Sequence, residues 1–461
     1  MLQGRDVPAG IFRAYDIRGI VGQGLDADSV RNIGQAIGSE VLDLGEHSLL
    51  VARDARLSSP ALVTALIDGI LNSGCNVVDL GVVPTPLLYF ATHTLPQTCG
   101  VMLTGSHNPR DYNGIKVVLQ RRALAAQRIT RLRERIVGGE LREGSGICTT
   151  HDIVPAYLAR ITGDMKYTRR FRVIIDAGNG VTGVVAPQLF RALGCDVDTL
   201  FCELDGNFPN HHPDPTRPEN LVQLRAALQA QHYDLGIAFD GDGDRMILMT
   251  SRGDMIDADH MLLAFAMDIL SEEPGAAIVF DVKSSHHLAH VISACGGRPI
   301  MCKSGHSFVK QQVLETEAAL GGEFSAHIFF GHRWYGFDDG LYVAARFLEL
   351  MDKYHATAQD LLERMPPSYS TPELFLTVSE EEKFELMALL EKELRLPGAS
   401  LYYLDGIRAN FKQGWGLVRA SNTTPNLVLR FEADDQEALL QIQQQFRSAL
   451  TRLLPHHSLP F

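Results

Sequence analysis

Three stretches of the chain repeat one order of hydrophobic and polar positions. They cover Ser48–Gly81, Phe171–Leu200 and Ala276–Gly305. Each opens with a β-branched hydrophobic run that ends at an aspartate, and then passes through a polar loop into an amphipathic helical pattern. A glycine closes that pattern before a second hydrophobic run; the aspartates are Asp54, Asp176 and Asp281, and the glycines are Gly74, Gly194 and Gly296. This order predicts three strand–helix–strand units with parallel strands, and therefore an α/β fold.

The last part of the chain has a different pattern. It begins near residue 365 with "MPPSYSTPELFLTV", where Pro and Ser indicate a boundary. A charged helix over 380–394, a strand-like "ANFKQGWGLVRAS", a strand "NLVLRFEA" and a long helix after Asp434 follow. These elements predict a smaller α+β domain.

The spacing of the three copies favours separate domains over a solenoid, because the copies begin at residues 48, 171 and 276. The predicted fold class is α/β, with three related α/β mixed-sheet domains and a smaller C-terminal α+β domain around a central cleft. We expect the domains at residues 1–150, 151–253, 254–365 and 366–461, with a glycine-rich linker over 137–146.

Composition narrows the classes of function. The 461 residues carry a net charge of -13 and have a pI near 5.7, which argues against nucleic acid as a partner. The seven cysteines are scattered without a CxxC pair, as in a reducing compartment. No leader-like hydrophobic region opens the chain and no apolar run reaches membrane-spanning length. We expect a cytoplasmic protein with no membrane partner, a monomer or weak dimer.

The stretch "MLTGSHNP" ends a hydrophobic run with a single hydroxyl group on a tight turn. Gly105 permits a backbone that other residues resist, and Asn108-Pro109 stops regular structure. Ser106 is therefore held at the tip of the turn. A single serine in a turn more often has a structural role in the loop than a catalytic one, so its function has to be inferred from the other motifs of the chain.

The segment "LGIAFDGDGDRMILM" is the most informative one. A hydrophobic strand runs into Asp240, Asp242 and Asp244, which repel one another unless a cation lies among them. Hard carboxylate oxygens suit Mg²⁺. An EF-hand loop also begins with alternating aspartates, but its next glycine and its twelfth-position glutamate are Arg245 and Ser251 here, so we reject it. A solvated acidic turn is the weaker alternative.

Other polar segments have both a structural and a functional interpretation. "DAGNGVTG" matches the dinucleotide pattern GxGxxG, yet its place in the second copy favours a tight strand–helix turn. Glu323, Ser325 and His327 share one face if "GEFSAH" is extended, and suit sugar hydroxyls. "VRASNTTP" could cradle a phosphate or be a plain hairpin turn. Further candidates are Lys303 and His306 in "KSGHSFVK" and Arg13, Tyr15 and Arg18 in "FRAYDIRG", while "NHHPDP" indicates a solvated loop.

Taken together, a serine, a carboxylate triad, a sugar-like loop and a phosphate cradle indicate phosphoryl transfer in a cleft where four domains meet. "TGSHNPRDYNGIKV", "DGDGDR", "GEFSAH" and "RASNTTP" resemble, in this order, the signatures of the α-D-phosphohexomutases. The likeness extends from "FRAYDIRG" to "LRFEA", over nearly the whole chain.

The resemblance implies a reversible exchange between hexose 1-phosphate and hexose 6-phosphate, with mannose or glucose as the sugar. Ser106 would be a phosphoserine, a 1,6-bisphosphate would be the intermediate and activator, and the last domain would close the cleft as a lid hinged near Met365. The implied catalytic residues are Ser106, Lys116, Arg245 and His327; the implied Mg²⁺ ligands are Ser106, Asp240, Asp242 and Asp244; and the implied contacts to the phosphorylated hexose are Tyr15, Arg18, Lys283, His306, Glu323, Ser325, Arg419, Ser421, Asn422 and Thr423.

One residue departs from the family pattern. Ala326 stands where the family usually has glycine between the serine and the histidine of the sugar loop. If this position has positive φ, alanine strains the loop by roughly 1 kcal/mol. The departure bears on sugar preference and leaves the nucleophile and the metal ligands unaffected.

Three rival functions are weighed. A phosphoglucosamine mutase shares the fold, and "GEFSAH" does not decide between the sugars. An inactive sugar-phosphate binding protein would have no need of Ser106, Lys116 and three aspartates. A serine hydrolase built on Ser106 and His107 fails because adjacent residues rarely orient as nucleophile and base, and because no G-x-S-x-G motif is present.

Overall fold

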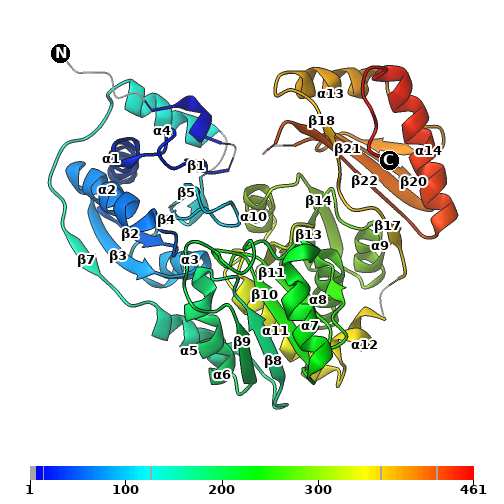
Figure 1. Ribbon diagram of the computed structural model, residues 1–461, viewed down its shortest axis with the longest axis horizontal. Helices are drawn as coiled ribbons and strands as arrows, with labels where there is room; N and C mark the ends of the chain where they lie inside the picture. The colour runs from blue at the N-terminus through cyan, green and yellow to red at the C-terminus, as the bar shows by residue number, and fades with distance from the viewer. Residues whose placement is uncertain (1–6, 14, 125–126, 364–365, 422–423) are drawn as a thin grey trace.

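The computed structural model describes residues 7–13, 15–124, 127–363, 366–421 and 424–461. Four sheets, each with its own helices, follow one another along the chain, as Figure 1 shows. We call these units domains 1 to 4. Domains 1 and 4 lie on either side of helix α10 (His306–Glu315), above domains 2 and 3 in this view. The expected four-domain α/β architecture is therefore confirmed.

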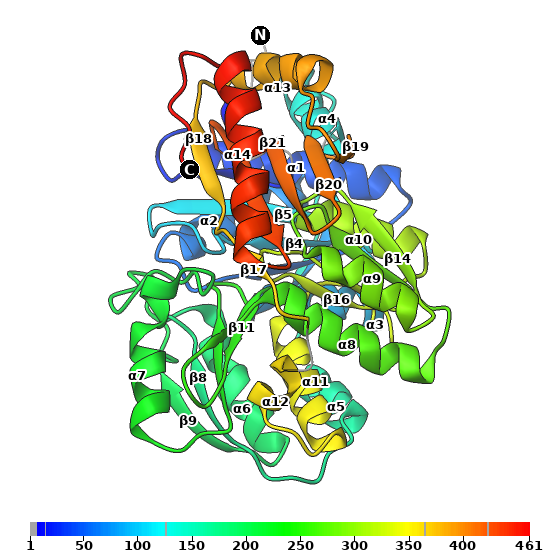
Figure 2. The ribbon, with the colours of Figure 1, turned by 90° about the vertical axis from the view of Figure 1, so that its right-hand side faces the viewer.

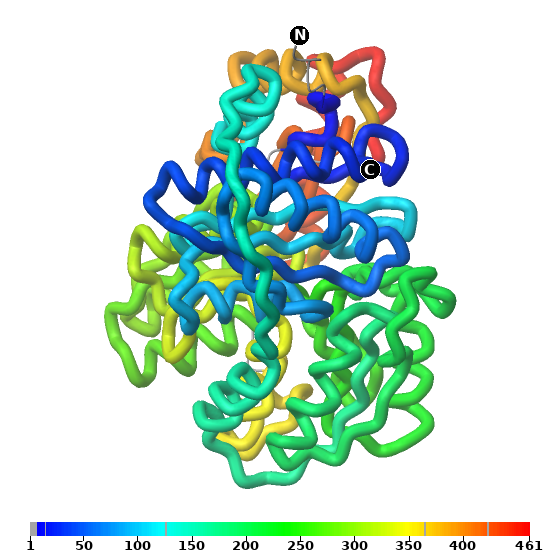
Figure 3. Tube along the Cα trace, turned by 90° about the vertical axis from the view of Figure 1, so that its left-hand side faces the viewer, coloured from blue at the N-terminus to red at the C-terminus, as the bar shows by residue number. Residues whose placement is uncertain are grey.

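Domain 1 has a mixed sheet in the order β1-β5-β4-β2-β3-β7, with β6 beside β5. β2 runs parallel to β3 and β4, whereas β5 is antiparallel to β4 and to β1. The segment between α4 and α5 runs down the outside of this domain (Figure 3). The elements are β1 (Ile17–Ile20), α1 (Ala27–Asp43), β2 (Ser48–Arg53), α2 (Ser59–Asn72), β3 (Asn76–Val82), α3 (Thr85–Thr94), β4 (Gly100–Leu103), β5 (Tyr112–Leu119), β6 (Arg122–Ala123), α4 (Gln127–Val137) and β7 (Cys148–Thr150).

Domain 2 has the strand order β12-β11-β10-β8-β9, in which β8 is parallel to β9 and β10. β10 and β11 form an antiparallel hairpin, whose turn consists of residues 240–245. The elements are α5 (Val154–Asp164), β8 (Arg172–Asp176), the 3₁₀ turn η2 (Val181–Val184), α6 (Ala186–Ala192), β9 (Asp196–Leu200), α7 (Val222–Ala230), β10 (Leu235–Phe239), β11 (Met246–Met249) and β12 (Met255–Ile256).

Domain 3 has the order β14-β13-β15-β16, with parallel pairs around β13 and an antiparallel β15–β16 pair. The elements are α8 (Ala258–Glu272), β13 (Ala277–Asp281), α9 (His286–Ala294), β14 (Arg298–Cys302), α10, β15 (Leu320–Gly322), β16 (Ile328–Phe330), α11 (Gly340–Lys353) and α12 (Ala358–Leu362). The three predicted strand–helix–strand units are thus β2-α2-β3, β8-α6-β9 and β13-α9-β14, as the hydrophobic pattern indicates.

Domain 4 has an antiparallel sheet in the order β17-β22-β21-β20-β19, with β18 also beside β22. Helix α14 crosses this sheet (Figure 2) and packs on β21 and β22. The expectation of a single strand over "ANFKQGWGLVRAS" is wrong. A turn at 412–413 divides this segment into two antiparallel strands, β20 and β21. The elements are β17 (Tyr369–Ser370), β18 (Leu374–Thr377), α13 (Glu382–Glu393), β19 (Ser400–Tyr402), β20 (Ile407–Phe411), β21 (Gly414–Ala420), β22 (Asn426–Ala433) and α14 (Gln436–Leu453).

The hydrophobic cores divide the chain unevenly. Domains 2 and 3 share one continuous core, which also contains α3 and several strand residues of domain 1. The other face of the domain 1 sheet has a core of its own, and domain 4 has a separate one. Among the helices within the described residues, none is both long and apolar enough to cross a membrane.

Candidate active site

Ser106 lies on the turn between β4 and β5, and its own backbone has positive φ. Its φ is 47°, and its side chain is buried. The left-handed residue of the turn is therefore the serine, and not Gly105 as the sequence suggested. Gly105 is needed for another reason: a Cβ there would lie 2.4 Å from Cζ of Arg56. The turn thus places a strained hydroxyl-bearing residue directly over a buried guanidinium.

Asp54 and Arg56, just after β2, hold this turn in place. The Asp54 carboxylate accepts hydrogen bonds from the Thr104 hydroxyl at 2.8 Å and from the Gly105 amide at 3.1 Å. The Arg56 guanidinium donates to the carbonyl oxygens of Ser106 at 2.8 Å and Asn108 at 2.6 Å. Both charged groups are almost fully buried. Because each hydrogen bond here has a charged partner, the clamp is stronger than neutral contacts would be.

The β10–β11 turn brings three carboxylates to Ser106. The Ser106 hydroxyl donates to Oδ2 of Asp240 at 3.0 Å. A Cβ at position 241 would lie 2.4 Å from the Ser106 carbonyl oxygen, so only glycine lets the two turns approach this closely. Asp240, Asp242 and Asp244 are at most 1% exposed, and one oxygen of each lies within 4.8 Å of the others. The expected grouping of one hydroxyl with three aspartates is therefore present in the structure.

The carboxylate cluster fits a divalent cation. Oδ1 of Asp242 and Oδ1 of Asp244 are buried and have no hydrogen-bond partner among the described residues. Burial, together with the charges of Asp244 and Asp242, raises the pKa of Asp240 to about 8. Buried carboxylate oxygens that lack partners and repel one another are the ligand set that Mg²⁺ takes. Burial would raise the pKa of Asp244, but Lys116 and His327 outweigh it and hold this pKa at about 2.

Lys116 and Arg245 supply the positive charge beside the cluster. Lys116, on β5, donates to Asp242 at 2.7 Å and to Asp244 at 2.6 Å. Burial opposes its charge, but these two aspartates raise the pKa of Lys116 well above its ordinary value. Arg245 donates to Asp240 at 3.2 Å and lies 3.8 Å from Asp214. Two buried cations therefore flank Ser106, where they can stabilise a transferring phosphoryl group.

His327 reaches the same cluster from domain 3. Its Nδ1 lies 3.0 Å from Asp338 and 3.8 Å from Asp244. Asp338 is fully buried and also pairs with Lys310 at 2.6 Å. Burial lowers the pKa of the His327 ring, but Asp244 and Asp338 outweigh this effect and raise it above the ordinary histidine value. The imidazole is therefore held in a fixed position and favours its protonated form.

The sugar-loop candidates lie in a turn rather than in an extended strand. Residues 323–327 connect β15 to β16, and the Glu323 amide donates to the His327 carbonyl oxygen at 2.8 Å. The expectation of alternating side chains on one strand face is therefore wrong, although Ser325 still hydrogen-bonds Glu323 within the turn. Ala326 has φ 73°. The backbone at this position is therefore left-handed, and alanine occupies it under strain.

The remaining substrate candidates divide between domain 3 and domain 4. Lys283 follows β13 and lies 3.3 Å from Glu373. Arg419, on β21, donates to Asp405 at 3.0 Å, and Asp405 in turn accepts from the Ser304 amide of domain 3 at 3.0 Å.

The tip of the domain 4 loop is only partly described. Ser421 accepts from the Thr424 amide at 3.1 Å, and the buried Lys383 donates to the Ser421 carbonyl oxygen at 2.8 Å. Asn422 and Thr423 lie outside the described residues.

Tyr15, Arg18 and His306 connect domain 1 to domain 3. Tyr15 donates to the Ser304 carbonyl oxygen at 3.3 Å and packs edge-on against His306. The His306 ring stacks on His327 with ring centres 5.1 Å apart. Arg18 donates to the side chain of Asn108, in the Ser106 turn. The contacts among these three residues and their neighbours therefore connect the sugar loop with the nucleophile turn.

Two minor interpretations are also settled by the fold. The GxGxxG stretch is the expected tight turn, because a Cβ at Gly180 would lie 2.9 Å from Cα of Gly241 in the carboxylate turn. The solvated loop expected at "NHHPDP" is wrong, since Asp214 is buried beside Arg245.

Sequence reasoning missed three positioning groups. Arg56, Asp214 and Asp338 are all buried next to predicted site residues. Arg56 lies two residues after Asp54 of the first repeat, whereas Asp338, in "GFDDG", lies beside no motif considered above; charged residues in loops are usually exposed. Their positioning role becomes visible only in the folded structure, where these charged groups are buried.

Ser106 and His107 contact each other, contrary to the expectation for adjacent residues. The Ser106 hydroxyl lies 3.1 Å from Nδ1 of His107, so the two adjacent side chains do meet. The hydrolase is still excluded, because the same hydroxyl lies among carboxylates, which would oppose an oxyanion.

Comparison with known proteins identifies four consecutive matches to one family. "Phosphoglucomutase/phosphomannomutase, alpha/beta/alpha domain I" matches residues 9–139, domain II matches 155–253, domain III matches 257–369, and the C-terminal domain matches 376–449.

Whole-chain relatives agree with these matches. A phosphomannomutase/phosphoglucomutase of Pseudomonas aeruginosa is 50% identical over 455 residues, which are 99% of this chain and 98% of the relative. A phosphoglucomutase of Neisseria gonorrhoeae is 45% identical over 444 residues, 95% of this chain and 96% of the relative. The crystal structure of a phosphoglucomutase/phosphomannomutase family protein from Burkholderia thailandensis superposes with a TM-score of 0.95 at 47% identity, covering 99% of this chain and 100% of that one.

Proposed function

Because the chain belongs to the phosphoglucomutase/phosphomannomutase family, we propose that it interconverts hexose 1-phosphates and hexose 6-phosphates, with mannose and glucose as the sugars. One observation carries this proposal: the buried Ser106 hydroxyl lies 3.0 Å from Asp240, inside a triad of buried aspartates. Phosphorylated hexoses are the proposed partners of a cytoplasmic monomer or weak dimer.

Ser106 carries the phosphoryl group in the proposed cycle. The free hydroxyl oxygen of the sugar phosphate attacks phosphorus, the bond from phosphorus to the Ser106 oxygen breaks, and a hexose 1,6-bisphosphate forms. The sugar hydroxyl loses one proton and the Ser106 oxygen gains one, so the step is balanced. The bisphosphate then reverses its orientation in the site, and its other phosphoryl group is transferred to Ser106. The same bisphosphate, added as an activator, phosphorylates an enzyme that has lost the group.

The flanking residues move the protons and balance the charge. Lys116 and His327 are the proposed general acid and base, because both are buried, fixed and within ion-pair distance of the triad. Arg245 stabilises the charge on the transferring group. Mg²⁺ held by Asp240, Asp242, Asp244 and the Ser106 oxygen would supply Lewis-acid stabilisation of that charge.

Substrate binding is proposed for the residues between domains 1, 3 and 4. The Glu323 carboxylate accepts hydrogen bonds from sugar hydroxyls, and the Ser325 hydroxyl can donate to them or accept from them. The charged and hydroxyl groups of domain 4 hold the phosphate that does not react. The proposed phosphate-binding residues are Arg419, Ser421, Asn422 and Thr423, and Tyr15, Arg18, Lys283 and His306 line the rest of the site.

The alternatives receive less support. The relatives reported above are named for mannose and glucose phosphates, which does not favour a phosphoglucosamine mutase. An inactive binding protein has no use for a nucleophile, two flanking cations and a cation-ready triad.

The proposal is tested by turnover of glucose, mannose and glucosamine phosphates with Mg²⁺ and a hexose 1,6-bisphosphate. We expect exchange of the glucose and mannose pairs, and a fall on the order of a thousandfold or more in Ser106→Ala, because this variant lacks the oxygen that carries the phosphoryl group. The exposed Ser145→Ala is the matched control. Full activity of Ser106→Ala would refute the nucleophile, and transfer of labelled phosphate to wild type alone would support it.

A further inference from the structure

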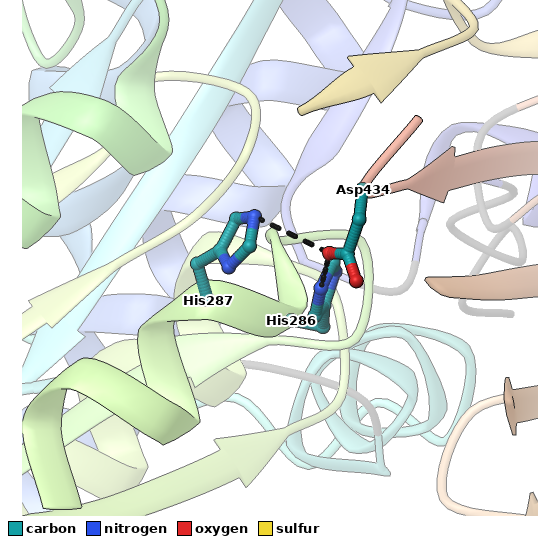
Figure 4. A group of neighbouring side chains, drawn as sticks. All are labelled: His286, His287 and Asp434. Atoms are coloured by element: carbon teal, nitrogen blue, oxygen red, sulfur yellow. Dashed lines mark hydrogen bonds and ion pairs between the residues drawn. The ribbon is translucent and has the colours of Figure 1, made fainter. Parts of the chain in front are cut away.

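Two adjacent histidines face an aspartate across the border between domains 3 and 4. His286 and His287 begin α9 in domain 3, and Asp434 follows β22 in domain 4, as Figure 4 shows. Nε2 of His286 lies 3.0 Å and Nε2 of His287 lies 3.9 Å from the same Asp434 oxygen. The two imidazole rings lie side by side with centres 4.1 Å apart. Three metal-ligating groups therefore converge on one point, although they come from two domains.

The distances suit a tetrahedral ion. Zinc–ligand bonds of about 2.0–2.2 Å place neighbouring ligand atoms about 3.3 Å apart in a tetrahedron. The two separations to the Asp434 oxygen, 3.0 and 3.9 Å, lie on either side of that value, and all three ligand atoms lie within 4.8 Å of one another. Small movements of these side chains would bring them to tetrahedral spacing. The side chains of His286, His287 and Asp434 are 24%, 16% and 44% exposed, which leaves a path for an ion from solvent.

The hydrogen bonds around the histidines leave nitrogens unused. Within the part of the chain that the structure describes, Nε2 of His287 is buried without a hydrogen-bond partner, while the ring hydrogen-bonds the backbone of Pro367. An imidazole that donates its other N–H to a backbone carbonyl is the usual state of a metal ligand.

His286 has a carboxylate on its outer side. Its Nδ1 lies 3.8 Å from Glu432, and Glu432 is itself fixed by the Trp415 indole N–H at 2.9 Å. The 3.8 Å separation is longer than a hydrogen bond, but it puts a carboxylate behind the His286 ring, where carboxylate–histidine–metal arrangements have one.

An ion pair between His286 and Asp434 alone is the simpler interpretation, but it does not account for His287. It would use His286 and Asp434 and leave the His287 nitrogen buried without a partner, which costs free energy. A divalent ion satisfies both nitrogens and the carboxylate together.

We propose that His286, His287 and Asp434 bind a divalent transition-metal ion of the Zn²⁺ class, and that this ion links domain 4 to domain 3. The two imidazoles distinguish the site from the carboxylate triad at Ser106, since Mg²⁺ prefers oxygen ligands and Zn²⁺ or Co²⁺ binds imidazole well. A water molecule would be the fourth ligand of a tetrahedral ion held by these three side chains.

The test is a Co²⁺ titration of the full-length protein in excess Mg²⁺, followed by visible absorption. We expect the intense band of tetrahedral Co²⁺ in wild type, displaced by Zn²⁺. His287→Gln should weaken Co²⁺ binding about tenfold or more, in line with the loss of a ligand. His290→Gln is the matched control, because this exposed histidine lies on the same helix. Asp434→Asn provides a second variant on the other domain.

The outcomes separate clearly. A band that is lost in both His287→Gln and Asp434→Asn and kept in His290→Gln supports the site. Absence of a tetrahedral band in wild type, or equal affinity in all variants, overturns it. If Zn²⁺ restrains domain 4, it should also inhibit turnover of the wild-type protein, and it should inhibit His287→Gln less strongly. This inhibition readout rests on the proposed function. The Co²⁺ spectrum does not, so failure of the mutase proposal would leave the metal test intact.

Discussion

The border between domains 2 and 3 and the border between domains 3 and 4 are built differently. At the first, one hydrophobic core runs without interruption from β8 to α12. At the second, polar and charged side chains cross between the domains: Arg408 donates to the Val282 carbonyl oxygen at 2.5 Å, the Arg430 guanidinium lies 3.7 Å from the centre of the Phe324 ring, and Asp405 accepts from the Ser304 amide at 3.0 Å. The only hydrophobic cluster that bridges this border among the described residues is small, consisting of Val282, Trp415 and Leu417 with Met301 against it.

This difference shows which groups are fixed and which can move. A shared hydrophobic core does not come apart without exposing large apolar areas to water. Polar borders between domains resemble transient interfaces and permit relative motion. Ser106, the aspartate triad and His327 therefore belong to the fixed part, whereas Arg419 and Ser421 are carried by a domain that can separate. We propose domain 4 as the lid; Met365, where we expected the hinge, lies outside the described residues.

The largest effect is expected from Arg56→Met in the fixed part. The substitution removes a buried cation and leaves four backbone carbonyl oxygens without their donor. We expect a loss of about 3 kcal/mol or more in stability, seen as a lower Tm, together with loss of turnover. Arg110→Met, at an exposed arginine near the same turn, is the control. An unchanged Tm would show that the turn does not depend on the clamp.

Asp338→Asn comes next, because it removes the charge that holds His327. Burial favours the neutral ring, and without the Asp338 charge the pKa of His327 falls. The ring then loses its proton at lower pH, so the limb of the kcat/KM profile that reports His327 moves to lower pH. We expect a fall in kcat on the order of tenfold to a hundredfold with little change in KM.

A second variant separates positioning from stability in this experiment. Asp338→Asn alone also leaves Lys310 buried without its partner. In Asp338→Asn combined with Lys310→Met, Tm should recover while the pH profile stays displaced. If the profile recovers along with Tm, Asp338 acts only through stability.

Arg430→Met tests the movable border, with a smaller effect. It removes a contact with Phe324 and a hydrogen bond to the Lys283 carbonyl oxygen. Loss of about 1 kcal/mol of contact between the domains should raise KM about fivefold and leave kcat nearly unchanged. Limited proteolysis between domains 3 and 4 should become faster. Arg452→Met, on the exposed face of α14, should alter neither measurement, and a large fall in kcat with Arg430→Met would contradict a movable border.

The smallest effect concerns the strained sugar loop. Ala326→Gly relieves a backbone with φ 73°, so Tm should rise by the equivalent of about 1 kcal/mol or less. Ala319→Gly, at a buried alanine outside the left-handed region, should lower Tm instead. The ratio of kcat/KM for mannose and glucose phosphates measures whether the strain affects sugar preference. Equal ratios in wild type and Ala326→Gly would show that it does not.

The repeat of hydrophobic runs, aspartates and glycines determined the α/β class and the three strand–helix–strand units, because strand and helix periodicities are local properties of the chain. The four motifs likewise indicated the nucleophile, the carboxylate triad and the sugar loop. The hydrophobic pattern gave wrong strand predictions where a turn interrupts a strand-like segment, as at residues 412–413 and 323–327. A single polar turn does not change the periodicity of the residues around it.

Only the tertiary structure decided which charges are buried. Arg56 and Asp338 have the sequence appearance of surface residues, yet contacts with segments more than fifty residues away and with His306, Lys310 and His327 enclose them. It also decided that Ser106 is the left-handed residue, and that His286 and His287 meet Asp434 from another domain. Such facts depend on which surfaces come together in space, and the periodicity of the chain contains no information about that.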